Sequence, residues 1–238
     1  KGQVADYNRR LAALAPQGAG GKALVAGGIA PTGLFIAPFG ESSFEELVEI
    51  YAEQAGALKD EVDLFMLETT MTMPEARAAV LAIRSVTGKP VWASFTCDEN
   101  GRTLSGTDVL AALIVMQGMG VSAFGLNCST GPDAMLEELR RLTPYATVPL
   151  IAKPNAGLPR MVDGKTVFDC PPEEFASYVP ALAEAGVRIF GGCCGTTPAH
   201  IAALREAVAK VDFAAFAPSA RDPDVIPCAS EKEARFIT

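Results

Sequence analysis

The sequence predicts an α/β fold whose parallel strands form a (β/α)8 TIM barrel, with about the first two strand-helix units apparently missing from this chain. Short apolar runs alternate with longer helical patterns six times, and the runs are continuous, as in parallel strands covered on both faces. Polar residues that look functional directly follow several of these runs. A barrel gathers its strand ends on one face, whereas an open doubly wound sheet spreads several of them apart, so the placement favours a barrel.

The first strand-helix unit pairs a strand at residues 22–27 with a helix at residues 42–58. Ser42 or Ser43 can cap this helix, and the acidic residues that follow suit its positive end. Five further units repeat the pattern. Their strands are expected at residues 62–67, 90–95, 123–126, 149–152 and 187–190, and their helices at residues 73–86, 106–119, 131–142, 171–185 and 197–211.

Both ends of the chain depart from this alternation. Residues 4–15 have a helical pattern with no strand before them, so we expect the front of an eight-stranded barrel to be absent from this chain. Residues 212–238 are rich in Ala, Pro and Asp, a composition typical of a linker or tail. The predicted barrel domain therefore covers residues 1–211.

The composition argues against several classes of partner. The chain has 238 residues, a formal net charge of -8 and no basic cluster, which argues against nucleic acid binding. No apolar run approaches the roughly 20 residues that a membrane span needs, so we expect no membrane partner. Six cysteines are too few for a disulfide scaffold in a chain of this length. We therefore expect a reducing, cytoplasmic location.

Three cysteines follow predicted strands. Cys193 and Cys194 are adjacent, between glycines, and Cys128 ends an earlier strand at the same predicted rim. Adjacent Cα atoms are about 3.8 Å apart, whereas disulfides prefer roughly 5.5 to 6 Å, so the neighbouring thiols do not readily bridge each other. Three thiolates around one position favour zinc with a fourth position left for substrate. The alternative is that these cysteines are small buried apolar residues.

The other three cysteines and the histidine are not predicted to bind the metal. Cys97, Cys170 and Cys228 lie apart from the Cys-Cys pair in the sequence and are assigned no function. His200 is the only histidine and lies in the first turn of the last predicted helix, behind the capping sequence TTP. We expect it to have a structural or supporting role rather than to bind the metal.

Several segments resemble a known family. GLNCSTGP (125–132) and FGGCCGTTPAHI (190–201) resemble the zinc motif of the homocysteine S-methyltransferase family. These segments are most similar to the amino-terminal, homocysteine-binding module of cobalamin-dependent methionine synthases. The resemblance spans nearly all of residues 1–211 and continues through GGIAPTG (27–33), MLETTMTMPEARAAV (66–80), SFTCDENGRTLSGTD (94–108) and KPNAGLP (153–159).

The resemblance implies a (β/α)8 barrel, homocysteine as methyl acceptor, and one zinc held by the three cysteines Cys128, Cys193 and Cys194. It also implies that Glu68 meets the substrate's ammonium group and that Asn155 completes the zinc coordination when homocysteine is absent. The alternative for Glu68 is a surface acid at a strand end, and the alternative for Asn155 is a turn residue next to Pro154 and Gly157. The chain departs from the family pattern because it lacks the Asp- and Gly-rich first-strand segment that helps to hold the amino acid part of homocysteine.

The predicted reaction is zinc-dependent methyl transfer to the thiol of homocysteine, which forms methionine. A free thiol has a pKa near 8.5 and the thiolate is the nucleophile, so a metal that binds the sulfur activates it at neutral pH. The resemblance favours methylcobalamin on a separate domain as the donor. Cobalamin and folate domains or proteins are therefore expected partners, because the chain has no D-x-H-x-x-G cobalamin signature of its own.

Other functions remain open from the sequence. A stand-alone homocysteine methyltransferase would use betaine or S-methylmethionine as the methyl donor. A structural or degenerate zinc-binding barrel would have four protein ligands and no position for substrate. A thiol oxidoreductase is disfavoured because no Cys-x-x-Cys spacing is present.

Overall fold

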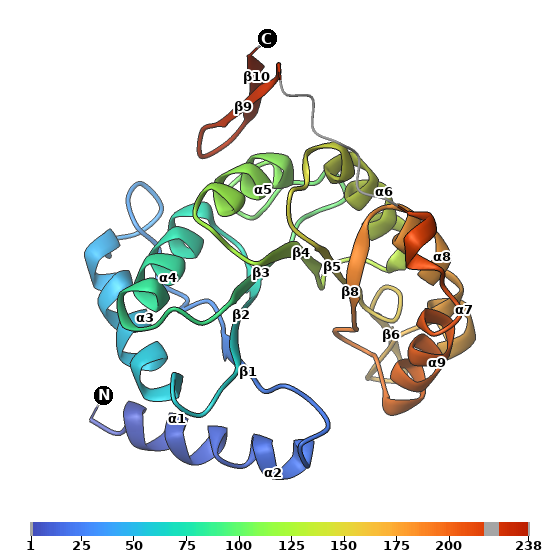
Figure 1. The fold of residues 1–238 in the computed structure, drawn as a ribbon, viewed down its shortest axis with the longest axis horizontal. Helices are drawn as coiled ribbons and strands as arrows, with labels where there is room; N and C mark the ends of the chain where they lie inside the picture. The colour runs from blue at the N-terminus through green and yellow to red at the C-terminus, as the bar shows by residue number, and fades with distance from the viewer. Residues whose placement is uncertain (1, 217–223, 238) are drawn as a thin grey trace.

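The computed structural model describes residues 2–216 and 224–237 and contains a six-stranded parallel sheet. The strand order is β1-β2-β3-β4-β5-β8, so strands adjacent in the sheet follow one another along the chain, apart from the β6–β7 hairpin (Figure 1). These strands are β1 (Ala26–Ile29), β2 (Leu64–Thr70), β3 (Val91–Phe95), β4 (Ala123–Asn127), β5 (Leu150–Lys153) and β8 (Val187–Phe190).

The helices that follow these strands form an arc on one side of the sheet (Figure 1). This arrangement is that of part of a (β/α) barrel, and the predicted α/β class with a parallel sheet is confirmed. The helices are α3 (Phe44–Leu58), α4 (Met73–Val86), α5 (Val109–Gly118), α6 (Pro132–Leu142), α7 (Pro172–Ser177), α8 (Val179–Glu184) and α9 (Pro198–Val208). Helices α1 (Val4–Ala12) and α2 (Ala15–Ala19) precede the sheet, and α1 packs against α3. Two short 3-10 helices cover Thr143–Tyr145 and Phe213–Ala215.

Most predicted elements have bounds within three residues of those observed, but two differ further. The strand expected at residues 22–27 begins only at Ala26, because Val25 exchanges hydrogen bonds with Asp63 and pairing with β2 starts one residue later. The helix expected at residues 171–185 is two helices, α7 and α8. Pro180 lies in the first turn of α8 and has no N–H to donate, which interrupts the helix there.

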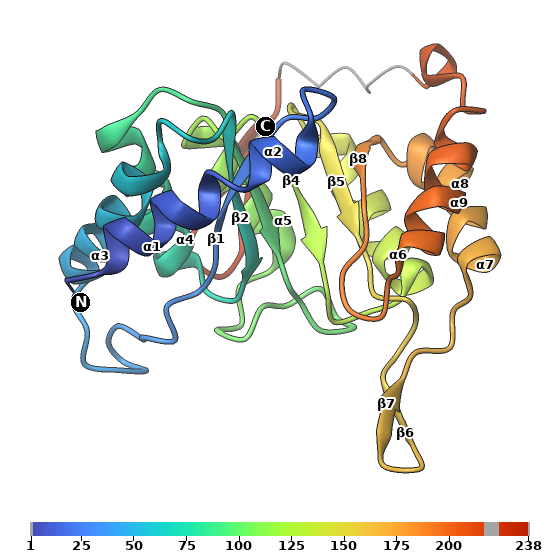
Figure 2. The same ribbon diagram turned by 90° about the horizontal axis from the view of Figure 1, so that it is seen from below.

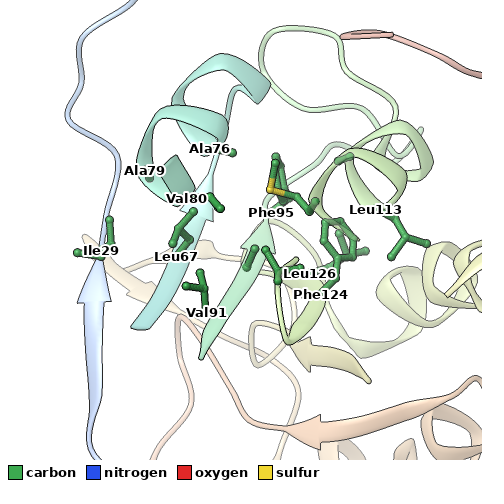
Figure 3. Packing of buried hydrophobic residues seen from close by; sticks show 14 of the residues in the cluster. Ile29, Leu67, Ala76, Ala79, Val80, Val91, Phe95, Leu113, Phe124 and Leu126 are labelled. Atoms are coloured by element: carbon green, nitrogen blue, oxygen red, sulfur yellow. The ribbon is translucent and has the colours of Figure 1, made fainter. Parts of the chain in front are cut away.

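Alternation along the strands separates two apolar layers. Side chains that point outward pack against the helices, among them Leu67, Phe95 and Leu126 (Figure 3). A second cluster on the inner face contains Met66, Ala123 and Ile151, with Trp92 and Ile189 packed against it. Successive strand residues face opposite sides. Inward positions near the carboxyl ends of three strands are therefore occupied by Glu68 on β2, Asn127 on β4 and Lys153 on β5.

A hairpin projects from the end of the sheet where β4 terminates (Figure 2). Its strands, β6 (Arg160–Val162) and β7 (Lys165–Val167), are antiparallel and exposed. Phe168, just after β7, packs beside Gly195, so the base of the hairpin adjoins the loop that carries the cysteine pair.

The carboxyl-terminal segment, expected to be a linker or tail, contains a second hairpin. Its strands are β9 (Ile226–Ala229) and β10 (Ala234–Ile237), and both contact α5. The Asp108 N–H donates to the Lys232 carbonyl at 2.9 Å, Arg102 pairs with Glu233 at 2.8 Å, and Phe236 stacks on Tyr145. Residues 217–223 and 238 of the expected tail lie outside the described residues. The domain boundary after residue 211 stays a prediction.

None of the helices in the described ranges 2–216 and 224–237 is both long enough and apolar enough to cross a membrane.

Replacing Gly125 by alanine tests the packing of the central strands. An ideal Cβ at Gly125 would lie 2.0 Å from the Ile151 carbonyl oxygen on β5, so the two strands must separate to admit it. We expect Gly125→Ala to lower the free energy of unfolding by about 3 kcal/mol, measured by urea denaturation. Gly56→Ala is the control, because Gly56 lies in α3 with open space around it and alanine there should stabilise by about 0.5–1 kcal/mol. Equal stability of the two variants would contradict the described strand spacing.

Candidate metal centre and substrate pocket

Cys128 is held in a backbone conformation that few residues adopt. It directly follows β4 with φ of 64°, and the next residue, Ser129, has φ of 60°. The Cys128 N–H donates to the Lys153 carbonyl at 3.1 Å, which continues the pairing of β4 with β5 past the strand end. Left-handed backbone at a residue other than glycine costs on the order of 1 kcal/mol or more, and such residues cluster at functional sites.

The loop after β8, which carries the other two cysteines, is fastened to the loop after β5. The Cys193 N–H donates to the Pro154 carbonyl at 2.9 Å, and the Ala156 N–H donates to the Cys194 carbonyl at 2.9 Å. The Asn155 side-chain oxygen accepts from the Cys194 N–H at 3.0 Å. These three hydrogen bonds, here called the loop clamp, fix the backbone of the cysteine pair against its neighbour.

Glycine is required on both sides of the cysteine pair. Gly195 has φ of 78°, and a Cβ there would lie 2.2 Å from the Phe168 ring. A Cβ at Gly192 would lie 2.4 Å from the Thr196 side chain. The glycine setting that the sequence shows around the two cysteines therefore has a steric cause.

The loop clamp and the turn at Cys128 bring three sulfur atoms together. The sulfurs of Cys128, Cys193 and Cys194 all lie within 4.8 Å of one another, and those of Cys128 and Cys194 are 3.7 Å apart. Two sulfurs bound tetrahedrally to zinc at about 2.3 Å would be about 3.8 Å apart. In the part of the chain that the structure describes, no further Cys, His, Asp or Glu joins this group. The spacing fits a metal ion, and the ligand role of the three cysteines stays a prediction.

The electrostatics of the cluster also favour a cation. The hydrogen bond with Cys128, together with burial, raises the pKa of Cys194 to about 11. Burial is the main cause that raises the pKa of Cys193, and the nearby Cys128 adds to it. Cys193 and Cys194 therefore resist deprotonation unless a positive charge compensates them. A borderline divalent ion such as zinc suits a set of three sulfur donors.

Asn127 supports the cluster, although the sequence assigned it no role. Its side chain is fully buried, and Nδ2 donates to the Cys193 sulfur at 3.7 Å and to the Thr69 hydroxyl at 2.8 Å. Oδ1 accepts from the Thr69 N–H and the Ser94 hydroxyl. A fully satisfied amide that donates to a ligand atom orients it and favours its charged form. The sequence signal that could have indicated this role is a polar residue at an inward strand position, directly before a cysteine.

Glu68, the candidate substrate residue two positions before the end of β2, forms an ion pair with Lys153 at the end of β5. Both side chains are partly exposed, at 38% for Glu68 and 21% for Lys153. The pair spans the inner face of the sheet, because β3 and β4 lie between the two strands. The sequence analysis named Glu68 as a candidate substrate residue but did not name its partner, Lys153.

Asn155 is buried, and the contact seen for its side chain is the one to the Cys194 N–H. Its carboxamide oxygen has a second lone pair, so this contact leaves the predicted role toward metal or substrate untested. The role visible in the structure is to position the loop of the cysteine pair.

His200 has the structural environment expected for it. Nδ1 accepts from the Thr197 N–H at 3.2 Å in a helix-capping arrangement, and Nε2 lies 3.0 Å from the Cys170 carbonyl. Both ring nitrogens are therefore engaged by the protein. Cys170 and Cys97 are buried and Cys228 is exposed on β9, all three outside the sulfur cluster. Burial is the main cause that raises the pKa of Cys97 to about 12, which makes it a poor nucleophile.

A cleft of about 670 Å³ lies beside the loop that follows Cys128, and none of the three cysteines lines it. Ser129 and Thr130, the residues after Cys128, line one side of it. Asp98 and Arg102, in the loop after β3, and Leu158, in the loop after β5, also line it. The size suits a small molecule or the reactive part of a larger group.

Comparison with known proteins gives the following matches. The homocysteine S-methyltransferase family matches residues 1–208 of the chain. The methionine synthase of Mycobacterium tuberculosis (strain ATCC 25618 / H37Rv) is 36% identical over 197 residues, covering 80% of this chain and 16% of that protein. The methionine synthase of Mycobacterium leprae (strain TN) is 35% identical over 196 residues, covering 79% and 16%. The chain thus spans about a sixth of the length of these relatives.

A solved structure is also similar. The homocysteine methyltransferase MmuM from Escherichia coli, in its apo form, is 29% identical with a TM-score of 0.64, over 83% of this chain and 67% of that one. The same protein is known in metallated and oxidised forms, each with a TM-score of 0.64.

Replacing Cys194 by alanine tests the ligand set. The change removes one of three sulfurs, so we expect zinc affinity to fall by more than the roughly 10- to 100-fold that loss of an outer-shell partner costs. Competition with a chromophoric chelator measures it. Cys228→Ala is the matched control, because Cys228 lies on β9 outside the cluster. Wild-type affinity in the Cys194 variant would mean that the ligand set is wrong.

Proposed function

Because the chain belongs to the homocysteine S-methyltransferase family, we propose that it is a domain for zinc-dependent methyl transfer to homocysteine, with methionine as the product. The observation that carries this proposal is the three-sulfur cluster at the ends of β4 and β8. Its spacing suits a tetrahedral ion, and no fourth Cys, His, Asp or Glu joins it among the described residues. The metallated form of the related Escherichia coli enzyme supports the presence of a metal.

Cys128, Cys193 and Cys194 would hold the zinc. When bound, zinc supplies the positive charge that keeps a thiol ligand deprotonated, and so nucleophilic, at neutral pH. The residues around the cluster are organised in advance for this task. Asn127 donates to the Cys193 sulfur, and the loop clamp fixes the backbone of the cysteine pair. Metal binding would therefore cost little further conformational entropy, because the loops that carry the cysteines are already ordered.

Glu68 would bind the ammonium group of homocysteine. It lies near the end of β2 at an inward position, on the same face as Asn127, the residue before Cys128. Its carboxylate pairs with the ammonium group of Lys153, and this contact supports a role in binding the ammonium group of a substrate. Asn155 would contact the substrate or the metal through its remaining lone pair.

The methyl donor in this proposal is methylcobalamin on another domain or protein. The chain matches about a sixth of two methionine synthases, so cobalamin and folate modules would come from elsewhere in a longer protein or from separate proteins. The cleft beside the loop that follows Cys128 would receive the methyl group. All six cysteines are free, in keeping with the reducing cytoplasm that we propose as the location.

A stand-alone enzyme with a small donor is the second candidate, favoured by the similarity to MmuM over 67% of that chain. The zinc-loaded protein is therefore incubated with homocysteine and, separately, methylcobalamin, betaine or S-methylmethionine. Methionine is measured by mass spectrometry. We expect zinc-dependent product with methylcobalamin. Product only with a small donor would favour the second candidate, and equal product from the Cys194→Ala variant would contradict both.

Replacing Glu68 by glutamine tests the ammonium site. Loss of one charge-assisted hydrogen bond should raise the dissociation constant for homocysteine about 10- to 100-fold, measured by calorimetry on the zinc-loaded protein. Zinc content should not change, because Glu68 is not a member of the sulfur cluster. Glu61→Gln, on the exposed surface before β2, is the control. An unchanged dissociation constant in the Glu68 variant would remove this residue from the site.

A further inference from the structure

We propose that Lys153 determines substrate specificity by binding the carboxylate of the substrate. Lys153 and Glu68 form an ion pair across the mouth of the barrel. When an α-amino acid thiol enters, the pair opens, Glu68 takes the ammonium group and Lys153 takes the carboxylate. This inference rests on the proposed function, because it assumes that an amino acid thiol is the substrate.

The backbone places Lys153 beside the sulfur cluster. Its carbonyl accepts the Cys128 N–H at 3.1 Å, and the next two residues, Pro154 and Asn155, make contacts of the loop clamp. Lys153 is therefore joined directly to the segments that position all three cysteines. A ligand whose sulfur reaches the cluster lies close to the base of this side chain.

The neighbouring strand leaves room for a long side chain at this position. Gly191 follows β8, and an ideal Cβ on it would lie 3.0 Å from Lys153 Cγ. A larger residue at position 191 would press on the lysine stem. The side chain thus runs along the inner face toward Glu68 instead of turning out to solvent, and only 21% of it is exposed.

Stability alone is a poor reason for such a pair. Partly burying two charges costs desolvation free energy, and apolar side chains of similar size often serve a core equally well. The layer below the pair is already apolar, with Met66 and Ile151 at the preceding inward positions of the same two strands. Opposite charges at the mouth are instead complementary to a zwitterion. Its ammonium group would pair with Glu68 and its carboxylate with Lys153, so two ion pairs replace one and the net charge of the site does not change.

The basic residues of nearby loops are engaged elsewhere. Arg102 pairs with Glu233 at 2.8 Å, and Arg160 pairs with Asp169 at 3.1 Å. Both of these arginine side chains are at least 40% exposed, on the outer part of the rim. Lys153 is the cation that the inner face presents to Glu68.

Three thiols separate the contributions of the two charged ends. The probes are homocysteine, 4-mercaptobutanoate, which lacks the ammonium group, and 3-aminopropanethiol, which lacks the carboxylate. Each is titrated into the full chain loaded with Co²⁺, and the shift of the thiolate-to-cobalt bands gives a dissociation constant. The variants are Lys153→Met and the control Lys165→Met, which removes an exposed lysine from β7.

We expect Lys153→Met to weaken binding of homocysteine and 4-mercaptobutanoate about 10- to 100-fold. The same variant should bind 3-aminopropanethiol as tightly as the unsubstituted chain or more tightly, because Glu68 no longer has a competing partner. Lys165→Met should leave all three dissociation constants unchanged. If the Lys153→Met substitution lowers the folded fraction, as measured by circular dichroism, the Lys153→Gln variant gives the same comparison with a polar side chain.

Other outcomes overturn the proposal in distinguishable ways. Tighter or unchanged binding of homocysteine by Lys153→Met would show that the lysine only covers Glu68. Equal weakening for all three thiols would show a disturbed metal site instead of a lost carboxylate contact. If no thiol shifts the bands of the unsubstituted chain, the proposed function itself fails, and the role of Lys153 fails with it.

Discussion

The candidate site depends on the hydrogen bonds that fasten the loop after β8 to the loop after β5. Without them, Cys193 and Cys194 would belong to a glycine-rich turn with many accessible conformations, and ordering it would oppose metal binding. The clamp uses backbone groups of Pro154, Ala156 and both cysteines, with the Asn155 side chain as one acceptor. The register of β5 against β8 brings these loops together, so the parallel sheet sets the sulfur positions.

The inner face then arranges charge around the sulfurs. Asn127 touches Cys193, while Glu68 and Lys153 place one negative and one positive group at the same mouth. The sulfur cluster calls for a cation, and the opposite charges beside it suit a zwitterion. A thiol that carries an amino acid group satisfies both requirements at once. This combination connects the fold to the proposed methyl transfer.

Much of this arrangement could be predicted from the sequence, because strand ends and glycines are local signals. The strand at 187–190 matches β8, and Cys128, Cys193 and Cys194 do meet. The Glu68–Lys153 pair could not be predicted, because it joins residues 85 positions apart across two intervening strands. The late start of β1 follows from Asp63, and the β9–β10 hairpin depends on contacts with α5, neither of which has a local signature.

The central claim is that three thiolates hold one metal ion and leave a position for the substrate. A Co²⁺ titration of the reduced, metal-free protein followed by homocysteine tests it most directly, through the thiolate-to-cobalt charge-transfer and ligand-field bands. The account predicts bands that saturate at one equivalent of Co²⁺ and then shift when homocysteine is added. Bands that ignore homocysteine would indicate a closed structural site, and the absence of bands would contradict a metal site at Cys128, Cys193 and Cys194.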